Sequence, residues 1–257
     1  MRMMTIAPRP ALASVVRSFA IVETEIETTR VLLPETGAVL GIRYAGSAAL
    51  IEGEGARVLP DVTLTGMRNS VRRVRTSAGG GIIVVAFHED GARVVFDVPI
   101  HQLFNGMAGL EELTAAEALE QLRVNVAAAH DPMSRVDTVE QFLLAHQSHR
   151  RRDRMVRAAV RAMRAACGTI SINSLSAGLG ISVDRFEKRF RQAVGASPKQ
   201  YSSVLRLRQA LSRYHEKANL TELAQHAGYY DQSHFIREFR AVTGESPLKF
   251  LRAANYC

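Results

Sequence analysis

The chain has 257 residues, of which 47% are hydrophobic and 23% are charged, and its formal net charge is +8. This composition is typical of a globular protein, and the length is sufficient for two domains without disulfides. No apolar run reaches the roughly 18 residues of a membrane-spanning helix, and the first segment lacks a secretory signal pattern, so we expect a cytoplasmic protein with no membrane partner. The two cysteines, Cys167 and Cys257, fit a reducing compartment.

The net charge is unevenly distributed along the chain. Residues 1–149 hold 13 basic and 17 acidic side chains, a net charge of −4, whereas residues 150–257 hold 20 basic and 8 acidic side chains, a net charge of +12. A basic segment joined to a nearly neutral one is typical of a nucleic-acid-binding module attached to a second domain. The alternative is a solubilising surface with an uneven distribution of charge.

Short apolar runs broken by Pro and Gly predict strands in the first half of the chain, within residues 29–46, 47–64 and 70–99. The triple glycine at residues 79–81 is expected to separate one pair of strands. Asp90 and Gly91 form a favourable tight-turn dipeptide for the next pair. This spacing predicts an antiparallel sandwich or a small barrel.

The periodicity then changes from that of strands to that of helices. Apolar residues recur at intervals of three and four in residues 114–128 and 136–146, and again from Met155 onward. Residues 146–154 contain no apolar side chain and are interpreted as a linker or as the polar start of the next helix. We therefore predict an α+β protein, with a β-rich domain and helical connector at residues 1–149 and an all-helical domain at residues 150–257.

Near the end of the chain, the phrase GASPKQY at residues 195–201 returns as GESPLKF at residues 244–250. The segments that precede the two phrases also match. In each copy, a short helix begins after an N-cap residue and ends at a Gly, and a turn leads to a second helix with its own N-cap. The matching pairs are Ser171 with Asn219, Gly180 with Gly228, Ser182 with Asp231, Phe186 with Phe235, and Phe190 with Phe239.

Each copy is predicted to be a helix-turn-helix, and the second copy has one extra residue in its turn. The two Phe residues of each second helix are four residues apart and share one face, which leaves the polar residues facing outward. Each Ser-Pro pair starts a further helix, with Ser as N-cap and Pro at the first helical position. Two generic packing hairpins are the alternative, but two copies in register within a basic segment favour DNA binding.

The repeat resembles the DNA-binding domain of AraC/XylS-type transcriptional regulators. The resemblance covers about the last hundred residues and rests on LSAGLGISVDRFEKRFRQAVGASPKQYSSVLRLRQAL and NLTELAQHAGYYDQSHFIREFRAVTGESPLKFLR. It implies two helix-turn-helix units joined by a long helix, roughly from Pro198 to Glu216. It also implies that both recognition helices enter successive major-groove faces on one side of double-stranded DNA.

The resemblance implies DNA contacts for two sets of residues. The base-facing positions are Asp184, Glu187 and Lys188 in the first recognition helix, and Gln232, Ser233, His234 and Arg237 in the second. Lys and Arg can donate to guanine, Gln can bind adenine and Glu can accept from the cytosine amine. The two acids of the first helix, Asp184 and Glu187, would repel the phosphate backbone. They indicate that this helix discriminates between base sequences more than it attracts DNA. The candidates for phosphate contacts are Arg185, Arg189, Arg191, Lys199, Arg206 and Arg240.

In regulators of this type, the N-terminal domain is often a cupin-like β-barrel that binds a small effector or dimerises. Residues 79–106 look like such a sensor domain, although they do not name a ligand. Residue type and position near strand ends give the candidate pocket residues, for each of which an ordinary core or surface role is the alternative: Arg43, Tyr44, Phe87, His88, Phe96 and His101.

Catalysis, a cofactor and a metal site are not expected. His88, Glu89 and Asp90 are adjacent, so strand alternation would point neighbours to opposite faces. The two histidines His88 and His101 are too few for a complete ligand set. His146 and His149 can share a helical face, but they lie in the hydrophilic segment. The triple glycine lacks the following Gly-Lys-Ser/Thr of a phosphate loop.

The leading hypothesis is a sequence-specific DNA-binding transcriptional regulator whose partner is promoter DNA. RNA polymerase, a small-molecule effector and a second copy of the chain are further candidate partners. The alternatives are a nonspecific architectural DNA binder and, from a different class, an enzyme that its basic domain recruits to DNA. Two recognition helices with different polar side chains favour sequence-specific binding.

Overall fold

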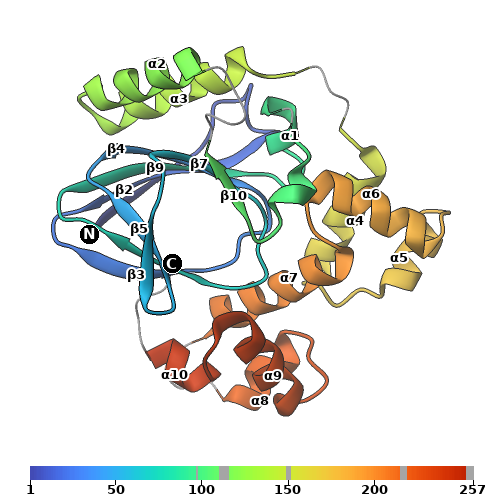
Figure 1. Ribbon diagram of the computed structural model, residues 1–257. Helices are drawn as coiled ribbons and strands as arrows, with labels where there is room; N and C mark the ends of the chain where they lie inside the picture. Colours follow the sequence, from blue (N-terminus) through green and yellow to red (C-terminus); the bar gives the residue numbers. More distant parts are fainter. Residues whose placement is uncertain (97, 110–115, 149–151, 215–218, 253–257) are drawn as a thin grey trace.

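The structure is a computed structural model that describes residues 1–96, 98–109, 116–148, 152–214 and 219–252. Its first part contains two antiparallel sheets that lie opposite one another (Figure 1). The six-stranded sheet has the order β1 (Arg2–Ile6), β2 (Val16–Thr24), β9 (Gly80–Phe87), β4 (Val39–Ala45), β7 (Val62–Thr65), β10 (Met107–Gly109). The four-stranded sheet has the order β3 (Thr28–Leu32), β8 (Arg72–Thr76), β5 (Ala48–Glu52), β6 (Gly55–Val58). The predicted β-rich N-terminal part is confirmed.

One face of the six-stranded sheet forms the main hydrophobic core. Side chains alternate between the two faces of a strand, so Leu40 and Ile42 point to the same side as their neighbours Val85 and Ile83 on β9. All four side chains are fully buried. They pack beneath α2 (Ala116–Ala128) and α3 (Pro132–Ala145), which cover this face in Figure 1.

Helix α3 shows how local sequence sets an element and packing then holds it. Asp131 caps its N-terminus, because its Oδ1 accepts hydrogen bonds from the N–H groups of Met133 and Ser134 at 2.9 and 3.0 Å. Val136, Val139 and Leu143 follow at helical spacing and are buried in the core. Both helices predicted in this region are confirmed over their described residues.

The predicted hairpin at Asp90 and Gly91 was wrong. Strand β9 ends at Phe87, and the segment after Gly91 forms a helical turn, α1 (Ala92–Val95). Gly91 is the N-cap of this turn, and its φ is −70°. A Cβ on Gly91 would lie 2.1 Å from the carbonyl oxygen of Val15. The glycine is therefore required by this close approach to the chain before β2 rather than by a hairpin turn.

The triple glycine lies at the break between the consecutive strands β8 and β9, as predicted, but these two strands do not pair with each other. Gly80 and Gly81 belong to β9 and pair with Thr24 and Glu23 of β2, whereas β8 lies in the other sheet. Gly79 alone has a positive φ, of 66°. The segment is the point at which the chain crosses from one sheet to the other, a tertiary property that strand spacing does not encode. The early strands β1 and β2 were not predicted, although β2 contributes fully buried Phe19 to the core.

After the 3₁₀ helix η1 (Ile100–Leu103) and β10, helices form the rest of the described chain. In the range 152–214 and 219–252, no residue is in a strand. The helices are α4 (Arg154–Ala165), α5 (Ile172–Gly178), α6 (Val183–Val194), α7 (Pro198–Arg213), α8 (Leu220–His226), α9 (Gln232–Thr243) and α10 (Pro247–Arg252). The predicted fold of two helix-turn-helix units, α5–α6 and α8–α9, joined by the long helix α7 is confirmed. Glu216, the predicted end of that helix, lies outside the described residues.

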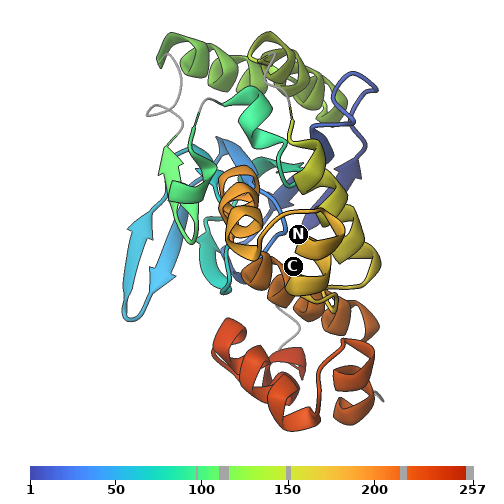
Figure 2. The same ribbon diagram turned by 90° about the vertical axis from the view of Figure 1, so that its right-hand side faces the viewer.

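The helical part contains two hydrophobic cores, one for each unit. The first surrounds Phe186 and Phe190 and also includes Met67 from the loop after β7. The second surrounds Phe235 and Phe239, and Val31 and Val71 of the N-terminal part pack against it. Both units therefore lie against the β-rich part, with the second unit below the sheets in Figure 2.

Candidate functional site

Side-chain caps fix the start of each recognition helix. The hydroxyl of Ser182 accepts a hydrogen bond from the N–H of Arg185 at 3.4 Å, and Asp231 accepts one from the N–H of His234 at 2.7 Å. Gly180 and Gly228 precede these caps with φ of 68° and 75°, which L side chains rarely adopt. The predicted turns thus form at equivalent positions in both copies.

The paired phenylalanines determine which face of each recognition helix points outward. Phe186 and Phe190 are fully buried on α6, and their rings meet edge to face at 5.6 Å. Phe235 and Phe239 repeat this arrangement on α9 at 5.5 Å. Since four-residue spacing places both rings on one side of a helix, the polar residues between them are left on the other side.

On α6, the outward face combines both signs of charge. Asp184 and Lys188 are exposed, whereas Glu187 is half-buried. Glu187 lies 4.0 Å from Arg191 one turn later, a weak surface ion pair. The acids therefore face the same solvent as the cations, and a DNA backbone would encounter mixed rather than uniform attraction.

On α9, Gln232, Ser233 and Arg237 are exposed, and Arg237 makes no ion pair among the described residues. Gln232 already accepts a hydrogen bond from the hydroxyl of Thr221 on α8 at 3.0 Å, which orients its amide. His234 is half-buried and lies 3.2 Å from Glu238. The side chain of His234 is thus partly engaged within the protein.

The six candidates for phosphate contacts fall into two groups. Two of them are held by carboxylates of this protein. Arg189 donates to Asp153, the N-cap of α4, at 2.8 and 3.0 Å, and Arg206 donates to Glu238 at 2.9 Å. The four exposed members are Arg185, Arg191, Lys199 and Arg240.

Sequence reasoning missed Glu238, which links the second recognition helix to the connector. Its carboxylate binds Arg206 and accepts a 3.4 Å hydrogen bond from Ser203, both on α7, and it also contacts His234. Arg206 further stacks over the Tyr229 ring at 5.1 Å. The only sequence signal was an acid four residues after a histidine, which is common on helices.

Helix α7 sets the separation of the two units. Ser197 accepts from the N–H of Gln200 at 3.2 Å, and the Gln200 side chain accepts from the N–H of Ser197 at 2.8 Å, forming a capping box before Pro198. Val204 and Tyr201 bury into the first core and Leu207 into the second. The connector is therefore packed at both ends rather than free.

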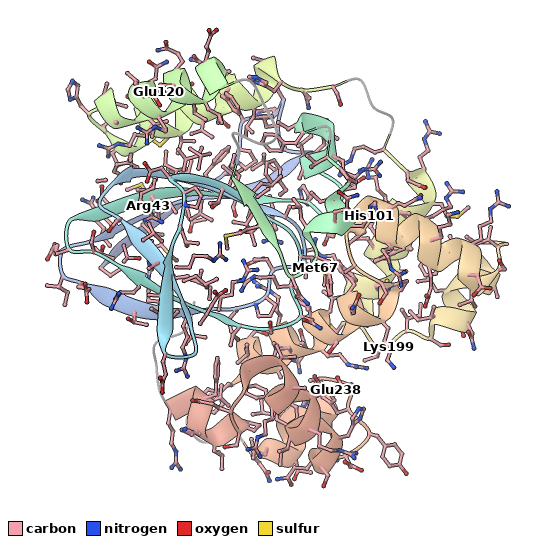
Figure 3. The ribbon with its side chains drawn as sticks, viewed as in Figure 1. Arg43, Met67, His101, Glu120, Lys199 and Glu238 are labelled. Carbon is pink, nitrogen blue, oxygen red and sulfur yellow. The ribbon has the colours of Figure 1, made fainter. Side chains whose placement is uncertain are left out.

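The six candidate effector residues do not lie together. Phe87 and Phe96 are buried in the main core and contact each other edge to face at 6.1 Å. Tyr44 lies toward α3, where Arg135 stacks on its ring at 4.2 Å. The remaining three are apart from these and from one another: Arg43 between the sheets, His88 in the turn after β9, and exposed His101 on η1 (Figure 3).

Arg43 lies on the face of the six-stranded sheet that looks toward the four-stranded sheet. It pairs with Ile82 across β4 and β9, and Ile82 and Val84 on this face are only half-buried, in contrast to the fully buried opposite face. Arg43 is 7% exposed, and its Nε has no hydrogen-bond partner among the described residues. A buried guanidinium whose Nε lacks a partner, beside half-buried apolar side chains, is suited to an anionic group.

Burial lowers the pKa of two arginines in the β-rich part, Arg43 and Arg68. Desolvation lowers the pKa of Arg43, with the Asp61 carboxylate acting against it and the charge of Arg30 adding to it. Arg68 is also 7% exposed, and burial lowers its pKa to about 10. Arg68 differs from Arg43 in being anchored, because it donates to the carbonyl of Leu33 at 3.0 Å. Both arginines still carry their charge at neutral pH.

No cluster of three or more His, Cys, Asp or Glu side chains able to hold a metal ion is present among the residues that the structure describes. The same residues include no helix that is both long and apolar enough to cross a membrane.

Comparison with known proteins agrees with the geometry of the C-terminal region. A family model described as a helix-turn-helix domain matches residues 175–253, which contain both recognition helices. The region is an AraC-type helix-turn-helix domain. No curated protein matches the chain at a significant level.

Solved structures extend the comparison to the whole fold. A variant of ToxT from Vibrio cholerae, in its apo form, is 12% identical with a TM-score of 0.50, and the match covers 91% of this chain and 97% of that one. A probable AraC family transcriptional regulator from Rhodopseudomonas palustris is 30% identical with a TM-score of 0.35 and covers 40% of this chain and 99% of its own. The C-terminal domain of AraT, a response regulator from Geobacillus stearothermophilus, is 21% identical with a TM-score of 0.38, over 40% and 88% of the two chains. The first match shows that the fold of this chain resembles a solved structure over 91% of its length.

In this chain, a buried acid joins the AraC-type domain to the β-rich part. Glu89, in the turn after β9, is 7% exposed and accepts a 2.7 Å hydrogen bond from the hydroxyl of Tyr201 on α7. Arg164 on α4 also donates to Glu89, at 3.3 Å. Burial and the Glu89 carboxylate raise the pKa of Tyr201 above its ordinary range, so the phenol remains a donor.

Further contacts attach the second unit of the AraC-type domain. Arg208 on α7 donates to the Glu35 carboxylate at 2.9 Å. The N–H of Val71 donates to the carbonyl of Val242, near the end of α9, at 3.0 Å. The two parts therefore meet through charged, backbone and apolar contacts.

Proposed function

We propose that this protein is a sequence-specific transcriptional regulator that binds promoter or operator DNA with both recognition helices. The observation that carries the proposal is that α6 and α9, each fixed by a cap and a buried Phe pair, present exposed polar faces at the two ends of one packed connector. Two helices held at a set separation suit two successive major-groove faces, which lie about 34 Å apart.

Within this proposal, polar side chains on the outward faces of α6 and α9 read the bases. Arg237 and Lys188 donate to guanine, and Gln232 recognises adenine through its amide. Asp184 and Glu187 accept hydrogen bonds from the cytosine amine and disfavour other bases. Ser233 and His234 contact base edges near the start of α9. The exposed residues Arg185, Arg191, Lys199 and Arg240 contact phosphates. We assign Arg189 and Arg206 to positioning, because each is already bound to a carboxylate of this protein.

Selection of binding sites from random double-stranded DNA tests the proposal. We expect enriched sequences with two boxes whose centres are about 10 base pairs apart, and protection of both boxes in a footprint. Lys188→Ala should relax selection in one box and Arg237→Ala in the other. Protection without sequence preference would instead support a nonspecific architectural DNA binder.

We further propose that the space between the two sheets binds a small anionic effector with an apolar part. Support comes from buried Arg43, whose Nε has no partner among the described residues, and from the half-buried apolar side chains on the same face. The contacts at Glu89 and Glu35 provide a physical connection between this part and the DNA-binding helices. RNA polymerase and a second copy of the chain stay predicted partners of the regulator.

A matched pair of probes tests the effector site. Octanoate should raise the unfolding temperature of the full chain, whereas the uncharged octanol should do so much less, because only the carboxylate pairs with Arg43. Arg43→Met preserves most of the side-chain volume and should abolish the difference between the two probes. Equal responses of the wild type to octanoate and octanol would exclude a role for the charge.

A further inference from the structure

A cavity lies where the β-rich part meets α4, and Arg43 is not among the residues that line it. Its volume is about 260 Å³. Ala13, Ser14 and His88 line it from the N-terminal part, while Arg157 and Arg161 line it from α4. The cavity is thus built by both parts of the protein.

The charges around this cavity are not balanced. Among the described residues, two acids, Glu89 and Asp90, line it together with four arginines, Arg152, Arg157, Arg161 and Arg164. Both acids already have partners, since Arg152 donates to Asp90 at 2.9 Å and Arg164 donates to Glu89 at 3.3 Å. Glu89 also accepts the hydroxyl of Tyr201. Both carboxylates are therefore already paired with groups of this protein, and the remaining charge around the cavity is positive.

The surplus resides in Arg157 and Arg161. Both are exposed, and within the described part of the chain neither makes an ion pair or a side-chain hydrogen bond. They are four residues apart and therefore neighbours on one face of α4. Like charges at this spacing repel each other, and an anion placed between them would relieve that repulsion.

The cavity also offers an apolar surface beside the guanidinium groups. Val156 and Val160 of α4 line it, and their exposed fractions are only 1% and 7% because they also pack into the core of the first helix-turn-helix unit. A ligand that occupies the cavity would therefore touch the core of the DNA-binding domain. It would touch the turn after β9 at the same time.

We propose that this cavity binds the carboxylate or phosphate group of a small molecule, held by Arg157 and Arg161. Bidentate guanidinium pairing suits both anions. Because the ligand contacts both parts of the protein, its binding stabilises their observed arrangement. The inference does not depend on the proposed DNA sequence specificity, and its test contains no DNA in the decisive step.

The test measures thermal unfolding of the full chain in rising concentrations of inorganic phosphate or citrate, with chloride keeping the ionic strength constant. We expect a saturable rise in the unfolding temperature, and the stronger of the two probes identifies the anion class. Arg161→Gln should weaken the apparent affinity at least about tenfold, as expected for loss of one charge-assisted pair. Arg161→Lys should retain part of it, because a point charge replaces the planar fork.

Arg154→Gln is the matched control. It removes one exposed charge from the same helix, and Arg154 does not line the cavity. This variant should respond to the anions as the wild type does. An equal rise in unfolding temperature for all three variants and the wild type would mean that the anions stabilise the protein only as salts in general. That result would overturn the proposal.

A second outcome also overturns it. If phosphate and citrate have no saturable effect, and Arg161→Gln instead lowers DNA affinity and flattens its salt dependence, then this face of α4 contacts the DNA backbone. The DNA measurement is made separately on the same purified proteins. Failure of the anion site would leave the base-reading proposal for α6 and α9 intact, since neither helix lines the cavity.

Discussion

Tyr201 and Glu89 form a buried 2.7 Å hydrogen bond between the connector helix of the DNA-binding region and the turn after β9. The two residues are 112 positions apart in sequence. A buried carboxylate is costly unless it receives hydrogen bonds, and here the phenol and Arg164 both donate to Oε1 of Glu89. If the first helix-turn-helix unit moved away from the β-rich part, the Glu89 carboxylate would lose these donors.

Tyr201→Phe should lower the free energy of unfolding by about 1–3 kcal/mol, because Glu89 loses a donor where water cannot easily replace it. Urea unfolding followed by circular dichroism measures the change. Tyr230→Phe is the matched control, since Tyr230 is 92% exposed and should change stability by no more than about 0.5 kcal/mol. Equal effects of the two substitutions would mean that the Tyr201 hydroxyl contributes nothing to the native state.

Alkaline pH should destabilise the protein through its buried tyrosines. Burial raises the pKa of Tyr229 to about 12, above its unfolded value of about 10. Its contribution is therefore fully present below about pH 10 and is lost as the pH rises toward the folded pKa. Tyr229→Phe should reduce the slope of unfolding free energy against pH by up to about 1.4 kcal/mol per unit in this window. Urea titrations at several pH values measure the slope, and an unchanged slope would show that Tyr229 titrates normally.

Arg237 and Arg240 lie one turn apart on α9 and should behave differently toward DNA. Arg237→Ala should cost about 1–3 kcal/mol of binding free energy and relax specificity at one base position. Arg240→Ala should weaken binding by a similar amount to all sequences. Binding measured by fluorescence anisotropy against single-base variants of the selected site distinguishes them, and a uniform loss for Arg237→Ala would reassign it to a phosphate contact.

The salt dependence of DNA binding should report the four exposed phosphate candidates. If Arg185, Arg191, Lys199 and Arg240 all engage, the plot of log affinity against log salt should have a slope of about −3.6. Arg206→Gln should leave this slope nearly unchanged while lowering affinity, because Arg206 is bound to Glu238 and positions α9. A decrease of about 0.9 in the magnitude of the slope for this variant would instead make Arg206 a direct phosphate contact.

Phe186→Ala and Phe239→Ala should each destabilise one helix-turn-helix unit by roughly 3–5 kcal/mol, since each side chain is essentially fully buried. Differential scanning calorimetry measures the loss, and DNA binding should fall in parallel. Leu248→Ala, at a 45% exposed position on α10, is the control and should have little effect. Native-like stability of both Phe variants would contradict the assignment of these rings to the two cores.

The sequence alone was sufficient for the double helix-turn-helix. The caps at Ser182 and Asp231, the glycines at positive φ and the Phe pairs are local signals, each acting within one or two helical turns. Such signals survive in any tertiary context, and two copies in register removed the ambiguity that one copy has. The exposed positions of Lys188 and Arg237 followed directly from that local geometry.

Only the tertiary structure decided which polar residues are free. Arg206 and Arg240 look equivalent in sequence, but Glu238 binds the first and leaves the second exposed. The segment after Gly91 has the composition of a strand yet forms a helical turn, at a point where the chain before β2 approaches Gly91 closely. Pairings such as Tyr201 with Glu89 join distant parts of the chain, and their free energy depends on burial, which local sequence does not specify. The local sequence thus determined the two recognition helices, whereas contacts buried between distant parts of the chain determined how these helices are positioned.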